Sequence, residues 1–188
     1  MNKVNILSRI SEMHHAIELI LLGANVHMIE METNLSRKCI RELYKATLKR
    51  SPPRGRIPVS IDWYIRWENN INSSMFYNVF DFFKNKPSSI FIEVLLKAYR
   101  LYLEQSSLIS SNKVVLGISR AWALLKHIES GALTTTFCLK CKGNFITLPY
   151  DKQPYFVCNY CSPPSRARKK IDTSNNHKSE YFIRDYTY

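Results

Sequence analysis

The sequence predicts a mainly α-helical protein that ends in a small module built around cysteines. Apolar residues recur every three to four positions in several segments between residues 6 and 129, which is the spacing of amphipathic helices. After residue 131 the composition changes to Thr, Cys, Lys and Tyr, and four of the five cysteines follow. We therefore expect a helical domain over residues 1–130, a cysteine module over 131–170 and a disordered tail over 171–188.

Residues 16–49 have the layout of a helix-turn-helix. A first helix breaks at Gly23, and a second is expected from about residue 26 to residue 32. Thr33 and Asn34 then make a turn, and Ser36 is a plausible N-cap for a third helix. In such a unit the first residues of the last helix face base edges in DNA, and the neighbouring cations face phosphates.

The rest of the helical part is divided by breaks. Two prolines and a glycine in SPPRGRIP (51–58) cannot continue a helix. In the aromatic block that follows, Trp63 and Trp67 are four residues apart, so one helix face can carry both. Residues 90–105 and 112–129 predict two amphipathic helices, and a glycine C-cap ends the second.

The cysteine module contains two C-x-x-C pairs separated by sixteen residues, formed by Cys138, Cys141, Cys158 and Cys161. Each pair lets two sulfurs of one tight turn reach the same ion at about 2.3 Å. We expect a hairpin between the pairs, with strands at 145–148 and 155–157 and a turn at 151–154. Four thiolates close a tetrahedral shell and leave no open position, so the predicted cofactor is one structural Zn²⁺.

Zinc is favoured over the other uses of four cysteines. Two disulfides would suit an exported chain, and the N-terminus has no secretion signal. A redox enzyme uses one C-x-x-C at a helix start, and an iron–sulfur cluster fits this even pairing less well than zinc does. The fifth cysteine, Cys39, lies on an apolar helix face and is expected in the core.

The charge of the chain favours a polyanionic partner. The formal net charge is +12, and a balance of this kind favours nucleic acid first and an anionic membrane surface second. Residues 33–56 carry eight cations against one acid, and residues 131–170 carry seven against one. No apolar run is long enough to span a membrane, so we expect a cytoplasmic protein.

Two groups of cations are candidate DNA contacts. The first group lies on the expected third helix and the second follows the last cysteine: Arg37, Lys38, Arg41 and Lys45, then Arg166, Arg168, Lys169 and Lys170. The plain alternatives are a solvated helix face and a helix that docks a protein. No Ser/His/Asp or paired-carboxylate arrangement is visible, so we do not expect an enzyme.

Several longer motifs carry a specific resemblance. They include AIELILLGA (16–24), SPPRGRIPVSIDWYIRWE (51–68), KAYRLYLEQ (97–105), SRAWALLKHIESG (119–131) and CSPPSRA (161–167). Together with the cysteine pairs they resemble the FlhC family, one subunit of the bacterial flagellar master transcriptional regulator. The motifs cover about residues 14–170. Where the family pattern leads us to expect a glycine directly after the second cysteine, this chain has Lys142 followed by Gly143.

The resemblance implies both a cofactor and partners. It implies zinc held by the four paired cysteines, and an assembly of two FlhC with four FlhD subunits. It also implies binding to double-stranded DNA upstream of flagellar promoters and promotion of transcription by RNA polymerase. The alternative of another class is a zinc-stabilised protein–protein adaptor that makes no direct contact with DNA.

Overall fold

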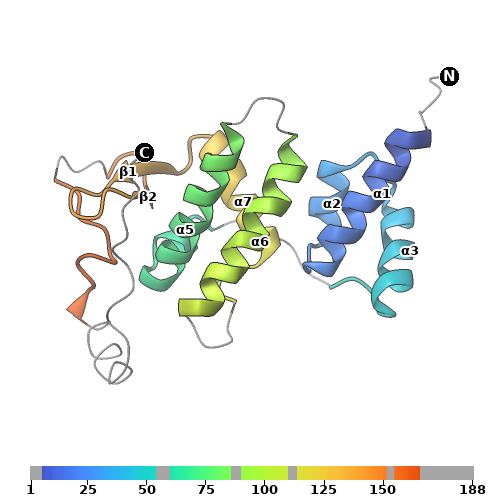
Figure 1. Cartoon of the computed structure of the whole chain (residues 1–188), viewed down its shortest axis with the longest axis horizontal. Helices are drawn as coiled ribbons and strands as arrows, with labels where there is room; N and C mark the ends of the chain where they lie inside the picture. The colour runs from blue at the N-terminus through green and yellow to red at the C-terminus, as the bar shows by residue number, and fades with distance from the viewer. Residues whose placement is uncertain (1–5, 54–59, 86–89, 110–113, 152–154, 166–188) are drawn as a thin grey trace.

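The computed structural model describes residues 6–53, 60–85, 90–109, 114–151 and 155–165. In these residues the chain forms seven helices and two short strands, so the mainly helical class is confirmed. Figure 1 shows three parts in a row along the longest axis. Helices α1–α3 lie at one end, α5–α7 lie in the middle, and the cysteine segment with β1 and β2 lies at the other end. The expected tail at 171–188 is outside the described residues.

The N-terminal part consists of α1 (Ile6–Leu21), α2 (Val26–Glu32) and α3 (Arg37–Leu48). Gly23 ends the first helix in a left-handed conformation with φ 83°, which glycine adopts without steric cost. Ser36 caps α3 by accepting a hydrogen bond from the Cys39 N–H group, as the sequence predicted.

Apolar residues from all three helices bury the inner faces of this part. Leu19 and Ile20 of α1 are fully buried, as are Met28 of α2 and Ile40 of α3. Cys39 is partly buried against the same core, which agrees with its expected place on an apolar helix face. The helix boundaries predicted from the caps and the periodicity are confirmed here because local signals and packing favour the same ends.

The middle part contains α4 (Asp62–Ile65), α5 (Trp67–Lys84), α6 (Phe91–Ile109) and α7 (Ile118–Glu129). Between α4 and α5 the backbone of Arg66 is extended, with φ −62° and ψ 140°. The expectation that Trp63 and Trp67 share one helix face is therefore wrong.

Helices α5, α6 and α7 enclose an aromatic core. The Phe76 ring lies 6.2 Å from the rings of Tyr99 and Tyr102 between centroids, and all three side chains are buried. The two buried hydroxyls are hydrogen-bonded: Tyr99 donates to the Leu116 carbonyl and Tyr102 to the Asn72 amide oxygen. A core of this kind needs such partners, because an unpaired buried hydroxyl is costly.

The strands form one antiparallel pair, β1 (Thr134–Phe137) and β2 (Asn144–Thr147). Residues 155–157 do not form a strand, so the predicted hairpin between the cysteine pairs is wrong. The first C-x-x-C itself turns the chain between β1 and β2, and the register pairs Phe137 with Asn144. A hydrogen bond from the Leu139 N–H group to the Phe156 carbonyl at 3.0 Å connects the later segment to the first cysteine turn.

No helix within the described ranges is both long and apolar enough to cross a membrane.

Candidate metal centre and basic helix

The two C-x-x-C pairs come together at one point. The four sulfur atoms of Cys138, Cys141, Cys158 and Cys161 all lie within 4.8 Å of one another. The sulfurs of Cys141 and Cys158, one from each pair, are 3.7 Å apart. A tetrahedral site with metal–sulfur distances of about 2.3 Å has edges of about 3.8 Å. The cluster is therefore close to the size that one thiolate-bound metal ion requires.

Two backbone N–H groups point at these sulfurs. The Cys158 N–H group donates to Cys138 Sγ at 3.3 Å, and the Cys161 N–H group donates to Cys158 Sγ at 3.4 Å. Such bonds orient metal ligands and stabilise their negative charge. Cys138 and Cys158 are fully buried, whereas Cys141 is exposed, so the cluster has a closed side and an open side.

The first cysteine turn departs from the expected glycine pattern. Lys142 occupies the left-handed region with φ 63°, and its N–H group donates to the Cys138 carbonyl at 2.9 Å. Gly143 follows, where a Cβ atom would lie 3.3 Å from the Phe145 ring and 3.7 Å from Cys141 Sγ. The lysine therefore adopts the conformation that a glycine would adopt more cheaply, and the ligand positions are kept.

The protonation of the thiols depends on burial and on the N–H donors. Burial raises the pKa of Cys138, but backbone N–H groups of Cys141, Cys158 and Lys140 outweigh it and lower that pKa to about 6. Burial raises the pKa of Cys158 and of Cys161. A metal ion that binds here must displace protons from the raised thiols, so its affinity falls as the pH falls.

A ladder of polar side chains on α5 fastens the cysteine segment to the helices. Asn70 donates to the carbonyls of Tyr64 at 3.0 Å and of Ile146 at 2.8 Å. Ser74 accepts from the Ile146 N–H group at 3.0 Å, and Asn78 donates to the Asn144 carbonyl at 2.8 Å. These side chains recur every four residues and so lie along one face of α5, where they serve β2 as a neighbouring strand would.

A second bond joins α5 to the last cysteine turn. The Trp67 indole N–H group donates to the carbonyl of Asn159 at 3.0 Å. Asn159 lies directly after Cys158, so the start of α5 holds the second pair while the α5 ladder holds β2. The cysteine cluster is therefore tied to α5 both through β2 and through its second pair.

The basic helix α3 presents the four cations that the sequence singled out on it, and all four are exposed. Arg37 is committed to α2: its Nε and Nη2 atoms donate to Glu30 Oε2 at 3.2 and 2.7 Å. Arg41 and Lys45 follow one and two turns later. Lys38, Arg41 and Lys45 make no ion pair with any residue that the structure describes.

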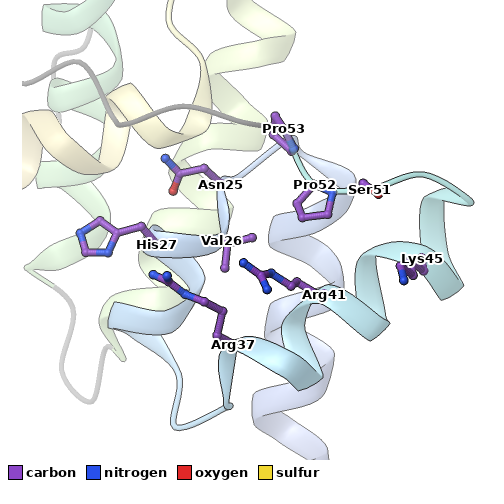
Figure 2. A pocket seen from close by; sticks show the side chains of 9 residues that line it. All are labelled: Asn25, Val26, His27, Arg37, Arg41, Lys45, Ser51, Pro52 and Pro53. Atoms are coloured by element: carbon purple, nitrogen blue, oxygen red, sulfur yellow. The ribbon is translucent and has the colours of Figure 1, made fainter.

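A hollow of about 580 Å³ lies beside α3 (Figure 2), and we call it the α2–α3 cleft. Its walls are the start of α2, one side of α3 and the segment after α3: Asn25, Val26, His27, Arg37, Arg41, Lys45, Ser51, Pro52 and Pro53. In Figure 2 the side chains of Arg37 and Arg41 reach from α3 toward Val26 on α2. Three cations that the sequence could place only on a shared helix face thus line one concavity.

Comparison with known proteins identifies the family. The model of the family described as "Flagellar transcriptional activator (FlhC)" matches residues 1–174. The flagellar transcriptional regulator FlhC of Enterobacter cloacae is 47% identical over 172 residues, which cover 91% of this chain and 90% of that protein. The regulator of the same name from Proteus mirabilis is 44% identical over 176 residues, covering 94% and 91%.

The chain belongs to the FlhC family. The family match begins at residue 1 and ends at residue 174, so it reaches beyond the motifs at both ends. The relatives are named as regulators of transcription, so the expectation of a regulator and not an enzyme is confirmed.

The second group of predicted DNA contacts, which rests on charge and spacing, is outside the described part of the chain. Arg166, Arg168, Lys169 and Lys170 lie outside the described residues, as does most of the predicted turn at 151–154. In the described part of the cysteine module, Lys140 and Lys142 are exposed. Figure 1 places this module and α3 at opposite ends of the molecule.

Sequence reasoning missed the polar residues that connect the three parts of this FlhC-family chain. The signal for the α5 ladder was present as Asn70, Ser74 and Asn78, at intervals of four within an aromatic helix. On α2, Glu32 connects the N-terminal part to α7 by accepting a hydrogen bond from the Trp122 indole N–H group at 2.6 Å. Nothing in the local sequence indicates this last bond, because its partners are 90 residues apart.

Proposed function

We propose that this chain is the DNA-binding subunit of a flagellar transcriptional activator. It acts in the cytoplasm with FlhD, as two copies with four of FlhD, and promotes transcription by RNA polymerase. The proposal is supported by membership of a family described as a flagellar transcriptional activator and by the net charge of +12. Much of that charge falls on residues 33–56, which include α3.

The observation that carries DNA binding is the exposed cationic side of α3. Arg41 and Lys45 have no carboxylate partner in the described part of the chain, so their charge is available to a polyanion. We assign the duplex contacts to Arg37, Lys38, Arg41 and Lys45, together with Arg166, Arg168, Lys169 and Lys170.

We propose that the four clustered cysteines hold one Zn²⁺. The donor set supports this choice, because four thiolates suit zinc and the sulfur separation fits its bond length. Zinc bound in this way supplies no reaction; it neutralises part of the thiolate charge and closes the module of residues 131–170 onto itself. With the module closed, its strand β2 is held against the ladder that contains Asn70 on α5, in the helical part, 1–130.

Fluorescence anisotropy of a flagellar-promoter duplex tests the function. The chain is titrated alone and with co-expressed FlhD, against the promoter duplex and a scrambled duplex, at several salt concentrations. Promoter-preferring binding that tightens with FlhD supports the proposal. Log affinity is expected to fall by about 0.9 per decade of salt for each phosphate that is neutralised. Complex formation with FlhD without duplex binding at low salt would overturn it.

A protein–protein adaptor is the second candidate, and one observation favours it. The cysteine module exposes several large apolar or aromatic side chains, among them Phe137, Tyr150, Tyr155 and Tyr160. Exposed groups of this kind are common where proteins dock. The adaptor predicts partner binding that depends little on salt and no affinity for duplex DNA, so the same titration separates the two functions.

A further inference from the structure

We propose that the α2–α3 cleft binds phosphate groups of the duplex backbone, so that α3 positions the protein on DNA and does not read base edges. This inference rests on the proposed DNA-binding function and goes beyond it, because it assigns one kind of contact to Arg37, Arg41 and Lys45. Four observations carry it.

The first observation is the engagement of Arg37. To read a guanine, an arginine presents two N–H groups of one edge to the O6 and N7 atoms together. In Arg37 the Nε and Nη2 groups of one edge already donate to a single oxygen of Glu30, at 3.2 and 2.7 Å. The remaining N–H groups can still reach a phosphate oxygen. Arg37 therefore contributes positive charge to the cleft, with one of its two bidentate edges already held by Glu30.

The second observation is the placement of the two uncommitted cations. Arg41 and Lys45 are four residues apart on α3, and both line the cleft. Like charges at this spacing on a helix repel each other. Among the described residues no carboxylate relieves that repulsion. A phosphate group bound between them would relieve it, and it would gain charge-assisted hydrogen bonds.

The third observation is the shape of the surface. A helix that reads bases must enter a major groove about 12 Å wide, and so it must protrude from its surroundings. Here the lining cations of α3 share a concavity with the start of α2 and with Ser51, Pro52 and Pro53 (Figure 2). Proline fixes φ, which makes such a wall stiff. A ridge of sugar and phosphate fits a concave surface of this kind better than a flat base edge does.

The fourth observation is a neutral hydrogen-bond donor among the lining residues. The Asn25 side-chain oxygen caps α2 by accepting from the Met28 N–H group at 2.8 Å. The same side chain lines the cleft with its amide N–H groups still available among the described residues. Neutral donors beside cations are typical of backbone contacts, which draw on Asn and Ser side chains as well as on Arg and Lys.

The test compares two double variants of the full chain, purified with co-expressed FlhD. Arg41→Ala with Lys45→Ala removes the uncommitted cations of the cleft. Arg9→Ala with Lys97→Ala is the matched control, because it removes one exposed arginine and one exposed lysine from helices outside the cleft. Anisotropy titrations use the promoter duplex and the scrambled duplex over a range of salt, and thermal melting verifies that each variant is folded.

The cleft variant is expected to lose two phosphate contacts. Its salt slope should fall by about 1.8, which corresponds to about 60-fold weaker binding near 0.1 M salt. The loss should be equal for the two duplexes, so the ratio of promoter to scrambled affinity stays constant. Glu30→Gln frees Arg37 and removes a negative charge next to the cleft, so it should tighten binding to both duplexes.

Three results would overturn the inference. One is a loss of promoter preference in the cleft variant, which would indicate base reading. Another is a large effect of Lys38→Ala, which alters an α3 cation outside the cleft lining, with no effect of the cleft variant. The third is an equal loss of duplex affinity in the matched control, which would show that the effect depends only on net charge. Failure of the unaltered complex to bind any duplex would instead refute the proposed function itself.

A free phosphorylated molecule offers the same chemistry as the backbone, and inorganic tripolyphosphate distinguishes the two sources. Calorimetric titration without DNA measures its binding to the cleft variant and to the unaltered chain. If tripolyphosphate binds through Arg41 and Lys45 while duplex affinity is the same in both proteins, the cleft serves a small anion and the inference for DNA is overturned. Competition between tripolyphosphate and the duplex at the unaltered cleft supports it.

Discussion

Replacing Asn70 tests how the cysteine module is held to the helical core. Its side chain is 3% exposed, and its amide donates to the carbonyls of Tyr64 and Ile146. Asn70→Ala removes two hydrogen bonds worth about 1 kcal/mol each and leaves both carbonyls short of a donor. We expect the free energy of unfolding to fall by about 2–3 kcal/mol. The neighbouring Asn69→Ala removes one half-buried bond, to the Trp63 carbonyl, and should cost about 1 kcal/mol.

Asn70→Asp sharpens this test because the side chain keeps its shape and loses its donors. A carboxylate facing two buried carbonyls should cost more than alanine does, about 4 kcal/mol at neutral pH. The folded state raises the pKa of such a carboxyl, so the loss should shrink as the pH falls through that raised value and the acid can donate one bond. Urea unfolding of the zinc-loaded chain, followed by circular dichroism, measures all three variants. Equal stability of Asn70→Ala and the unaltered chain would refute the proposed role of the ladder.

Further predictions concern the metal centre and the core. Cys138→Ser should weaken zinc retention against a chelator by more than about 100-fold, because the lost sulfur is a buried member of the cluster. Zinc stoichiometry after dialysis measures this loss. Retained stoichiometric zinc would exclude Cys138 as a ligand. Lys142→Gly should raise the free energy of unfolding by about 0.5 kcal/mol in urea titrations, since glycine relieves the left-handed backbone and loses only the lysine contact over the Phe137 ring; Lys142→Val should lower it. Burial lowers the pKa of His127, which packs against the Tyr64 ring, so its neutral form is favoured in the folded state and stability should be lost as the pH falls below about 6.5. His127→Phe should flatten that part of the stability curve, and an unchanged curve would exclude His127 as its source.

Local signals were sufficient for much of the secondary structure. The limits of α2, the Ser36 cap of α3 and the left-handed glycine after α7 follow from short patterns, and the structure has them. The wrong prediction of a hairpin between the cysteine pairs also has a local cause. Strand composition at 155–157 predicts a strand that does not form, whereas β1 (Thr134–Phe137) forms from Thr and Phe, which favour strands equally well.

The helix break at Arg66 shows where pattern reading stops. Spacing alone allowed Trp63 and Trp67 on one face, but the two side chains serve different neighbours. The Arg120 guanidinium lies over the Trp63 ring, with its Cζ atom 4.2 Å from the ring centroid. The Trp67 indole N–H group instead donates to the Asn159 carbonyl. Neither partner is near in sequence, so the choice between a continuous and a broken helix was decided by long-range contacts.

The sequence by itself determined the helical class, the cysteine spacing and the positions of the cations on α3, because each depends on residues within a few turns of one another. Only the tertiary structure decided how those cations are used. It ties Arg37 to Glu30, leaves Arg41 and Lys45 beside the wall of Ser51–Pro53, and docks β2 on the polar ladder of α5. These outcomes depend on which buried and half-buried polar groups find partners far away in the chain, and periodicity contains no information about such pairs.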